Sequence, residues 1–369
     1  MVQHKKKPIY QQIVEDLKRK IRLGEITKDQ PLPTQIELAK MYDTSEISSR
    51  RALTELVNEG LIFRVRGKGS FLEQSGSGDI SAERSMEIRI LYLIYRSNHF
   101  RMFNHRFYDG LLSGLHEVCD EHGVDFHTWE VGPEYELPNE PDIGLVCLPH
   151  VPGGEEIPIE MLKKWKEERR RLVTVHFFYP HLQLPYVIGD NLTGGYLATE
   201  HLLSLGHKRI GIILTGVSRL KMNQEFSLRL EGYKLALSQH RIELDPELVC
   251  VVEGNQEMEE MGQQGLKKLL DLSNPPTAIF ATSDYKALGA VKTARSMGLD
   301  IPGDLSIVGY DDIVISQYTL PGLTTVDQNS ELMGKRAAQI LLTEWNNENR
   351  KDEIVPKLIV RDSTGELQK

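Results

Sequence analysis

The stretch Ala278–Asp312, AIFATSDYKALGAVKTARSMGLDIPGDLSIVGYDD, is organised as a strand, a helix and a second strand. The apolar run 278–281 is typical of a buried strand, and alanines at helical spacing follow it until Gly298. A second apolar run at 305–308 completes a βαβ unit. Because ligands bind beyond the carboxyl ends of parallel strands, Asp284, Asp311 and Asp312 are candidate ligand-binding residues.

Length and composition set the class of protein. A chain of 369 residues with 40% hydrophobic residues predicts two or three domains with a substantial core. No apolar run approaches the roughly 18 residues of a membrane helix, and no apolar stretch of a signal peptide follows the basic N-terminus. The three cysteines lack the spacing of metal ligands. We therefore expect a reduced, cytoplasmic protein with no membrane partner, no bound metal and no cofactor.

The net charge of −9 hides an uneven distribution. Residues 1–75 hold 14 Lys and Arg against 10 Asp and Glu, which leaves 30 basic and 43 acidic residues in the remainder. A small basic head on an acidic body favours a local contact with a polyanion.

The head, residues 1–72, is predicted to be a winged helix-turn-helix. Apolar residues at helical spacing predict helices at Pro8–Leu23, Gln35–Tyr42 and Glu46–Asn58, and Thr34 with Glu37 forms a capping box before the second. The segment 61–72 predicts two short strands around a glycine-rich tip. Small hydroxyl residues allow a helix to lie close in the major groove of DNA, and cations on a wing reach phosphates or the minor groove. The candidate DNA-contacting residues are Thr34, Ser45, Glu46, Ser48, Ser49, Arg50, Arg66, Gly67 and Lys68.

The head resembles the DNA-binding domain of the GntR family. The motifs that carry this resemblance are Ile9-Tyr10-Gln11-Gln12-Ile13, Leu32-Pro33-Thr34, Glu37-Leu38-Ala39, Arg51-Ala52-Leu53, Gly60-Leu61 and Gly67-Lys68-Gly69-Ser70-Phe71. The resemblance implies that Ser45, Ser48, Arg50 and the wing face DNA. Two positions that usually hold arginine in the family are Ile36 and Glu46 here. A glutamate can accept a hydrogen bond from a cytosine amino group, so Glu46 either reads a base or points away.

Residues 73–87, EQSGSGDISAERSME, predict a flexible linker. From residue 88 to 369, apolar strands alternate with helices, which predicts an α/β body with parallel sheets. The strand count exceeds one sheet, so we expect two subdomains, about 88–188 plus 329–350 and 189–328 plus 351–369.

The body resembles the LacI/GalR sensor domain, which has a periplasmic-binding-protein-like fold. The motifs are Asp190-Asn191, Gly206-His207-Lys208-Arg209-Ile210, Gly232-Tyr233, Ser283-Asp284, Val308-Gly309-Tyr310-Asp311-Asp312 and Leu323-Thr324-Thr325-Val326. A GntR head on such a body is the arrangement of arabinose-repressor-like regulators. The resemblance implies that Arg229, Asp311 and Gln328 line the effector site, with Ser283 beside them.

The chemistry of these residues suits a sugar. A carboxylate accepts hydrogen bonds from two hydroxyls, an arginine fork donates to two oxygens, and a carboxamide does both. Further candidates are a hydroxyl acceptor, an aromatic ring for the apolar face of the sugar, and two residues of the opposite wall: Glu225, Phe177, Tyr95 and Asn98. For Asp284 we favour a helix cap over ligand binding, and Asp312 is likewise open to a structural role.

These observations predict a sugar-responsive, DNA-binding transcription regulator, a repressor that acts as a homodimer. Three alternatives stay open: a sensor of a nucleobase or a phosphorylated sugar, a ligand that acts as a corepressor, and a sugar-binding protein without a regulatory role. The sequence contains no zinc-protease helix, no P-loop and no Gly-x-Ser-x-Gly elbow, so we expect no enzymatic activity.

Overall fold

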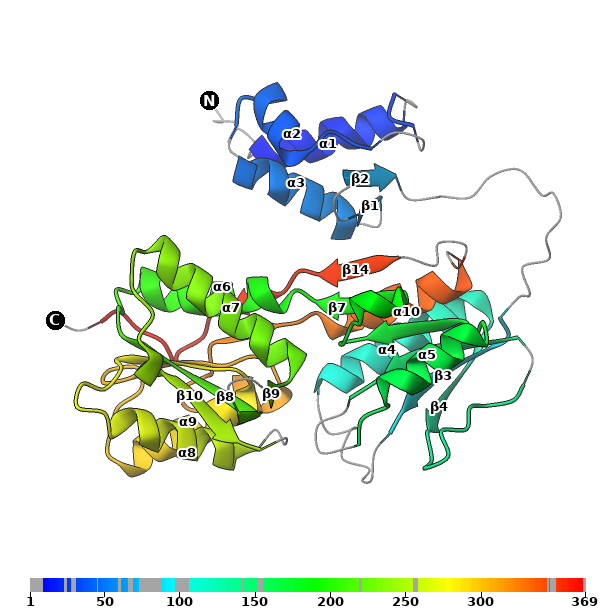
Figure 1. Ribbon diagram of the computed structural model, residues 1–369. Helices are drawn as coiled ribbons and strands as arrows, with labels where there is room; N and C mark the ends of the chain where they lie inside the picture. Colours follow the sequence, from blue (N-terminus) through cyan, green and yellow to red (C-terminus); the bar gives the residue numbers. More distant parts are fainter. Residues whose placement is uncertain are drawn as a thin grey trace. The chain divides into compact units, whose positions relative to one another are not determined.

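The computed structural model divides the chain into two compact units, Met1–Ser85 with Arg350–Asp352 and Met86–Asn349 with Glu353–Lys369 (Figure 1). The predicted linker, 73–87, lies outside the residues that the structure describes. The described residues are 9–22, 25–27, 31–44, 46–58, 61–65, 69–72, 88–96, 106–140, 142–150, 155–218, 221–254, 258–343, 345 and 350–367.

The head consists of three helices and a two-stranded antiparallel ribbon. Its elements are α1 (Ile9–Arg22), α2 (Gln35–Met41), α3 (Glu46–Asn58), β1 (Ile62–Val65) and β2 (Gly69–Leu72). The predicted helices agree with these bounds to within one residue. All three helices contribute apolar side chains to one core, among them Ile13, Leu38 and Leu56, each fully buried. The amphipathic patterns thus specify a helix-turn-helix with a wing, whose tip at 66–68 lies outside the described residues.

The first half of the body is built on a six-stranded sheet with the order β14-β7-β6-β5-β3-β4. Its strands are β3 (Ile90–Tyr95), β4 (Asp125–Glu130), β5 (Ile143–Leu148), β6 (Leu172–Val175), β7 (Tyr186–Gly189) and β14 (Lys351–Ile354). The helices are α4 (Arg106–His122), α5 (Ile159–Glu167) and α10 (Ser330–Leu342). Gly114 and Gly334 let α4 and α10 pack closely, because a Cβ at Gly114 would lie 2.0 Å from the Glu331 carbonyl oxygen.

The second half of the body contains the βαβ unit of the opening sequence stretch. Strand β11 (Ala278–Ala281), helix α9 (Asp284–Ser296) and parallel strand β12 (Ser306–Val308) confirm that prediction. The sheet order is β10-β8-β11-β12, with β9 paired to β8. The other elements are β8 (Ile210–Ser218), β9 (Lys221–Met222), β10 (Val249–Glu253), α6 (Asn191–Ser204), α7 (Gln224–Gln239), α8 (Glu259–Leu270), β13 (Thr325–Asp327) and β15 (Lys357–Ile359).

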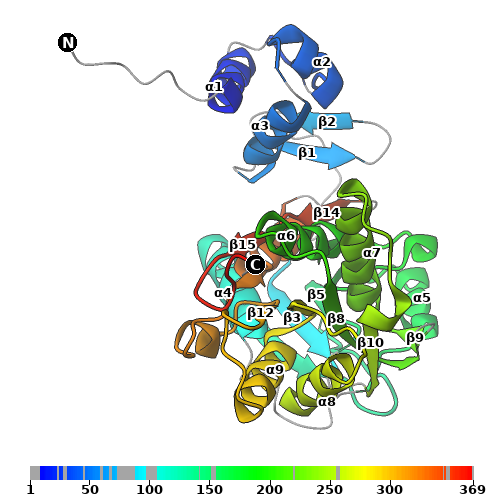
Figure 2. The ribbon, with the colours of Figure 1, turned by 90° about the vertical axis from the view of Figure 1, so that its left-hand side faces the viewer.

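Helices cover both faces of this second sheet. Helices α6 and α7 pack together on one side, and α8 and α9 pack together on the other, as the two views show (Figure 1, Figure 2). This arrangement explains why the strands are apolar on both faces.

The predicted subdomain boundary at residue 351 is wrong. The segment Lys351–Ile354 is a strand of the first sheet, and the Ile354 carbonyl accepts a hydrogen bond from the Asp190 amide at 2.8 Å. Only β15 and the residues after it join the second half, where β15 pairs with β13. Val355 and Pro356 separate the two strands, and a proline lacks the amide that would continue the ladder.

Candidate functional site

Arg229, Asp311 and Gln328 come from three separate segments of the chain and meet in the second half of the body. The Gln328 carboxamide donates to Asp311 Oδ1 at 2.6 Å, and Arg229 Nη2 lies 3.7 Å from the same oxygen. The three residues are at most 9% exposed. The cluster therefore contains an amide hydrogen-bonded to an anion and a cation that forms an ion pair with the same anion, and these are groups that recognise vicinal hydroxyls.

The Arg229 guanidinium is held from several sides. Its Nε donates to Asn191 Oδ1 at 2.8 Å, and Nη1 donates to the Thr282 carbonyl at 2.5 Å. Its Cζ lies 3.6 Å from the centroid of the Tyr310 ring. Asn191 begins α6 and Thr282 follows β11. These contacts fix the direction of the arginine fork before any ligand binds, and neither periodicity nor residue spacing identified Asn191, Thr282 or Tyr310 as its supports.

Asp311 has a strained backbone. Its φ is +106°, in a region that residues with a Cβ rarely adopt. Such conformations persist where the surrounding structure enforces them, and they concentrate at functional sites. The Asp311 amide donates to the Val326 carbonyl at 2.8 Å, which anchors the strained residue to β13.

Gln328 completes the cluster with a carboxamide oxygen that can still accept a hydrogen bond. Oε1 of Gln328 is buried and has no hydrogen-bond partner among the described residues, while Nε2 is engaged with Asp311. A buried acceptor without a partner is unfavourable, so a hydroxyl or amino group of a ligand at this oxygen would relieve that cost.

Ser283, predicted to lie beside the effector, caps a helix, and Asp284, interpreted as a possible helix cap, does not. Ser283 is 1% exposed and is the N-cap of α9, with its side chain accepting from the Lys286 amide. Asp284 is therefore not the cap. Its carboxylate accepts from the Ile313 amide at 2.9 Å, from Ser316 at 2.6 Å and from Thr325 at 2.5 Å. Burial, and then the charge of Asp311, raise the pKa of Asp284 to about 7.

Asp312, the third acid of the opening stretch, forms an ion pair with Arg361 at 2.7 Å. It therefore binds the C-terminal segment to the second half of the body. Of the three acids at these strand ends, Asp311 is the one that lies in the cluster with Arg229 and Gln328.

The residues predicted for the rest of the effector site lie in both halves of the body. Glu225 is 5% exposed and precedes Arg229 by one helical turn of α7, and its Oε1 accepts from Asn223 at 3.3 Å. Phe177 is 7% exposed and packs edge-on against the His150 ring, with centroids 5.4 Å apart. Tyr95 is buried at the end of β3, and Asn98 lies outside the described residues.

Three hydrogen bonds, made by two pairs of residues, connect the halves beside these residues. The Gln224 carboxamide bonds to the backbone of Phe178 in both directions, at 3.1 Å and 3.0 Å. Asn223 lies 3.2 Å from His150 Nε2. The N-terminus of α7 is thus bonded to the segments that follow β5 and β6.

The DNA-contacting candidates of the head divide into three groups. Glu46 and Arg50 are exposed on α3, Ser48 is half-buried, and Thr34 is the exposed N-cap of α2. Ser49 is fully buried, so the prediction that it contacts DNA is wrong; the helix turns its side chain toward the core. Four candidates lie outside the described residues: Ser45, Arg66, Gly67 and Lys68.

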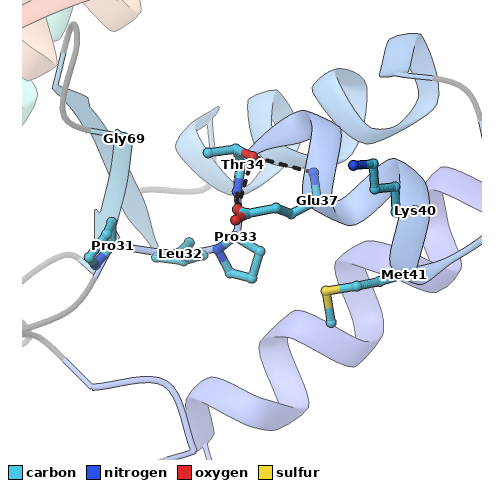
Figure 3. A pocket seen from close by; sticks show the side chains of 8 residues that line it. All are labelled: Pro31, Leu32, Pro33, Thr34, Glu37, Lys40, Met41 and Gly69. Carbon is cyan, nitrogen blue, oxygen red and sulfur yellow. Dashed lines mark hydrogen bonds between the residues drawn. The ribbon is translucent and has the colours of Figure 1, made fainter.

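A shallow hollow of about 620 Å³ lies beside α2 (Figure 3). Its lining includes Pro31, Pro33 and Met41, together with the Thr34–Glu37 capping box, in which the Glu37 carboxylate accepts from the Thr34 amide at 2.7 Å. The capping box satisfies its own polar groups, and it serves to start α2.

Two other kinds of site have no support in the described part of the chain. No group of three His, Cys, Asp or Glu side chains there could hold a metal ion. Nor is any helix of those residues sufficiently long and apolar to cross a membrane.

Two family models match the chain. Residues 9–72 match bacterial regulatory proteins of the gntR family. Residues 199–364 match the periplasmic binding protein-like domain. The first of these matches covers the head, and the second covers most of the second half of the body together with α10 and β14 of the first half.

The chain is also similar to characterised repressors. It is 38% identical over 200 residues to the ribose operon repressor of Haemophilus influenzae, a match that covers 53% of this chain and 58% of the relative. It is 30% identical over 270 residues to the transcriptional repressor PurR of the same species, covering 66% of this chain and 75% of PurR. The chain thus spans less than two thirds of the ribose repressor.

Among solved structures, the chain is similar to a LacI family regulator from Enterococcus faecium with bound ribose, with a TM-score of 0.63. The match covers 76% of this chain and 100% of the chain of that regulator. The sequence identity is 24%, so this likeness establishes the fold alone.

Proposed function

The chain belongs to the LacI family of transcriptional regulators, and from this premise we propose that it is a repressor which a small carbohydrate releases from DNA. The GntR-type head contacts the operator, and the body binds the effector. No catalytic role is part of this proposal, and a DNA-binding function places the protein in the cytoplasm.

The cluster of Arg229, Asp311 and Gln328 carries the proposal for the effector. A sugar has adjacent hydroxyls that each donate and accept one hydrogen bond. Asp311 accepts from such a pair, the Arg229 fork donates to two oxygens, and Gln328 Oε1 receives a further hydroxyl. Asn191 and Tyr310 hold Arg229 in place, so little side-chain entropy is lost on binding. Ser283 and Glu225 are proposed to border the ligand.

A nucleobase is the second candidate effector, and the 30% identity to PurR over 75% of that protein favours it. A base edge presents donors and acceptors to Gln328 and Asp311 as well. It would also require an aromatic ring for stacking, for which Phe177 and Tyr179 are the available side chains at the end of β6.

Release from DNA follows from linkage. An effector that strengthens one arrangement of the two halves changes the spacing of two heads in a dimer, and these must fit successive major grooves about 34–36 Å apart. If the effector lowers operator affinity, operator DNA must lower effector affinity by the same factor.

A thermal-shift screen of the full chain tests the effector class. The arms are D-ribose and other pentoses, hexoses, ribose 5-phosphate, and purine and pyrimidine bases. A ligand at one hundred times its Kd stabilises the native protein by about 2.7 kcal/mol, which raises the melting temperature of a protein of this size by several degrees. A shift with free pentoses supports the proposal. A shift with bases alone supports the second candidate, and a shift with sugar phosphates alone contradicts both.

A further inference from the structure

A cluster of polar side chains on the head joins α2 to α3. Gln35 of α2 lies between Glu46 and Arg50 of α3. Arg50 Nε donates to Gln35 Oε1 at 3.0 Å, and Gln35 Nε2 donates to Glu46 Oε2 at 3.4 Å. Both contacts are exposed.

The carboxamide keeps two opposite charges apart. Glu46 and Arg50 are four residues apart on one helical face, and a glutamate that precedes an arginine by four residues is in the favourable order for a direct ion pair. Such a pair would occupy both groups with each other. Gln35 instead accepts from the arginine and donates to the glutamate at the same time, because its carboxamide carries both an acceptor and a donor.

The neighbouring side chains of α3 pack against the rest of the head. Ser49 is fully buried. Arg51 lies over the Tyr10 ring of α1, with its Cζ 4.0 Å from the ring centroid, and donates to the Tyr10 hydroxyl. Glu46 and Arg50 are therefore the exposed charged side chains of the first half of α3 that contact Gln35, whereas the exposed Arg51 contacts α1.

A glutamate on a DNA-facing helix lowers affinity for every sequence, because it repels phosphates. It can, however, select a base, since a carboxylate accepts from the N4 amino group of cytosine. Arginine makes its most common specific contact with O6 and N7 of guanine. The contact through Nε fixes the plane of the Arg50 guanidinium relative to Glu46.

We propose that Gln35 is a positioning residue that makes Glu46 and Arg50 a joint reader of one cytosine and one guanine in each operator half-site. The proposal rests on the proposed DNA-binding function. It assigns base preference to a side chain that itself contacts neither base.

The test is selection from random double-stranded DNA with the full chain, followed by sequencing and by affinity measurements on the enriched site. The variants are Glu46→Gln, Gln35→Met, Gln35→Glu and, as a charge-matched control on α3, Glu55→Gln. Far-UV circular dichroism and melting temperature establish that each variant folds.

Each variant has a distinct expected result. Glu46→Gln should change one motif position from cytosine to adenine, the base that a glutamine reads. Gln35→Met should lower discrimination at both positions by about tenfold or more. Gln35→Glu still accepts from Arg50 but repels Glu46, so it should keep the guanine and lose the cytosine. Glu55→Gln should leave the motif unchanged.

Two results would contradict the proposal that Glu46 and Arg50 read two bases jointly, without contradicting the proposed DNA-binding function. One is a wild-type motif that neither Glu46→Gln nor Gln35→Met alters. The other is an equal loss at every motif position with Gln35→Met, together with a lower melting temperature, since that would make Gln35 structural only. If the wild-type protein enriches no motif, the proposed DNA-binding function itself is wrong, and the joint reader falls with it.

Discussion

Asp311 combines a positive φ with a side chain shared by Arg229 and Gln328. A buried carboxylate that accompanies a buried arginine is favourable only while the pair stays intact. Asp311 therefore stabilises the buried Arg229. Among Arg229, Asp311 and Gln328, it is also the residue that offers a ligand a negative charge.

We expect Asp311→Asn to abolish stabilisation by the effector while operator binding persists. The asparagine keeps the size of the side chain but loses the charge and one acceptor for hydroxyls. The measurement is the melting shift with the ligand found in the screen, beside operator affinity without ligand. Asp271→Asn, at an exposed residue, is the charge-matched control. An unchanged melting shift in Asp311→Asn would remove this residue from the site.

Asp284 should make the protein less stable as the pH rises, whereas most carboxyl groups in proteins have the opposite effect. Its folded pKa of about 7 exceeds the ordinary aspartate value of 3.8, so the native state binds the proton more tightly than the unfolded state. The contribution of Asp284 is fully present below pH 3.8 and is lost as the pH rises through about 7.

Asp284→Asn should therefore flatten the change in unfolding free energy between pH 5 and pH 8, measured by urea denaturation at each pH. Asp312→Asn is the control, because it replaces a nearby buried carboxylate by an amide and leaves Asp284 in place. A wild-type protein whose stability does not fall over this range relative to Asp284→Asn contradicts the assignment.

At the scale of the element, α3 shows how one helix separates folding from recognition. Its periodicity places Ala52, Leu53 and Leu56 in the core of the head, and the same geometry buries Ser49 while it exposes Arg50. A hydroxyl residue in the first turns was therefore insufficient to predict a DNA contact, because adjacent residues on a helix point about 100° apart.

Arg50→Ala should lower operator affinity by about tenfold or more and leave effector affinity unchanged. The measurement is fluorescence anisotropy at fixed salt. Lys163→Ala, at an exposed position of α5 in the body, removes the same charge away from the head. Equal operator affinities of wild type and Arg50→Ala would exclude α3 as the recognition helix.

At the scale of the whole molecule, the body presents an exposed apolar segment that we propose as the contact between two copies. Val314, Ile315, Tyr318 and Leu320 are 53%, 51%, 71% and 77% exposed. Exposed apolar side chains in such density mark interaction surfaces. A second copy is the partner that a repressor of a two-fold symmetric operator requires.

The double variant Ile315→Asp with Tyr318→Asp should be monomeric in light scattering after size exclusion, because two charges per copy would be buried in the interface. Its operator affinity should fall, since one head then binds alone. Leu235→Asp, at an exposed leucine on α7, is the control and should keep the wild-type mass. A double variant with that same mass would place the interface elsewhere.

The sequence by itself determined the order of the elements and the two kinds of domain. These follow from local patterns: apolar runs for the parallel strands, amphipathic periods for the head helices, and turn residues at their ends. The βαβ unit at 278–312 is a short-range structure, so its pattern was sufficient.

Only the tertiary structure decided which residues meet. Asn191 and Thr282 are far from Arg229 in sequence, and no periodicity states that they share its guanidinium. Asp284 and Asp311 end neighbouring strands with similar sequence signals, yet one is enclosed by three donors and the other faces Arg229. The strand at 351–354 likewise joined the first sheet, because strand pairing depends on contacts between distant segments that local sequence does not encode.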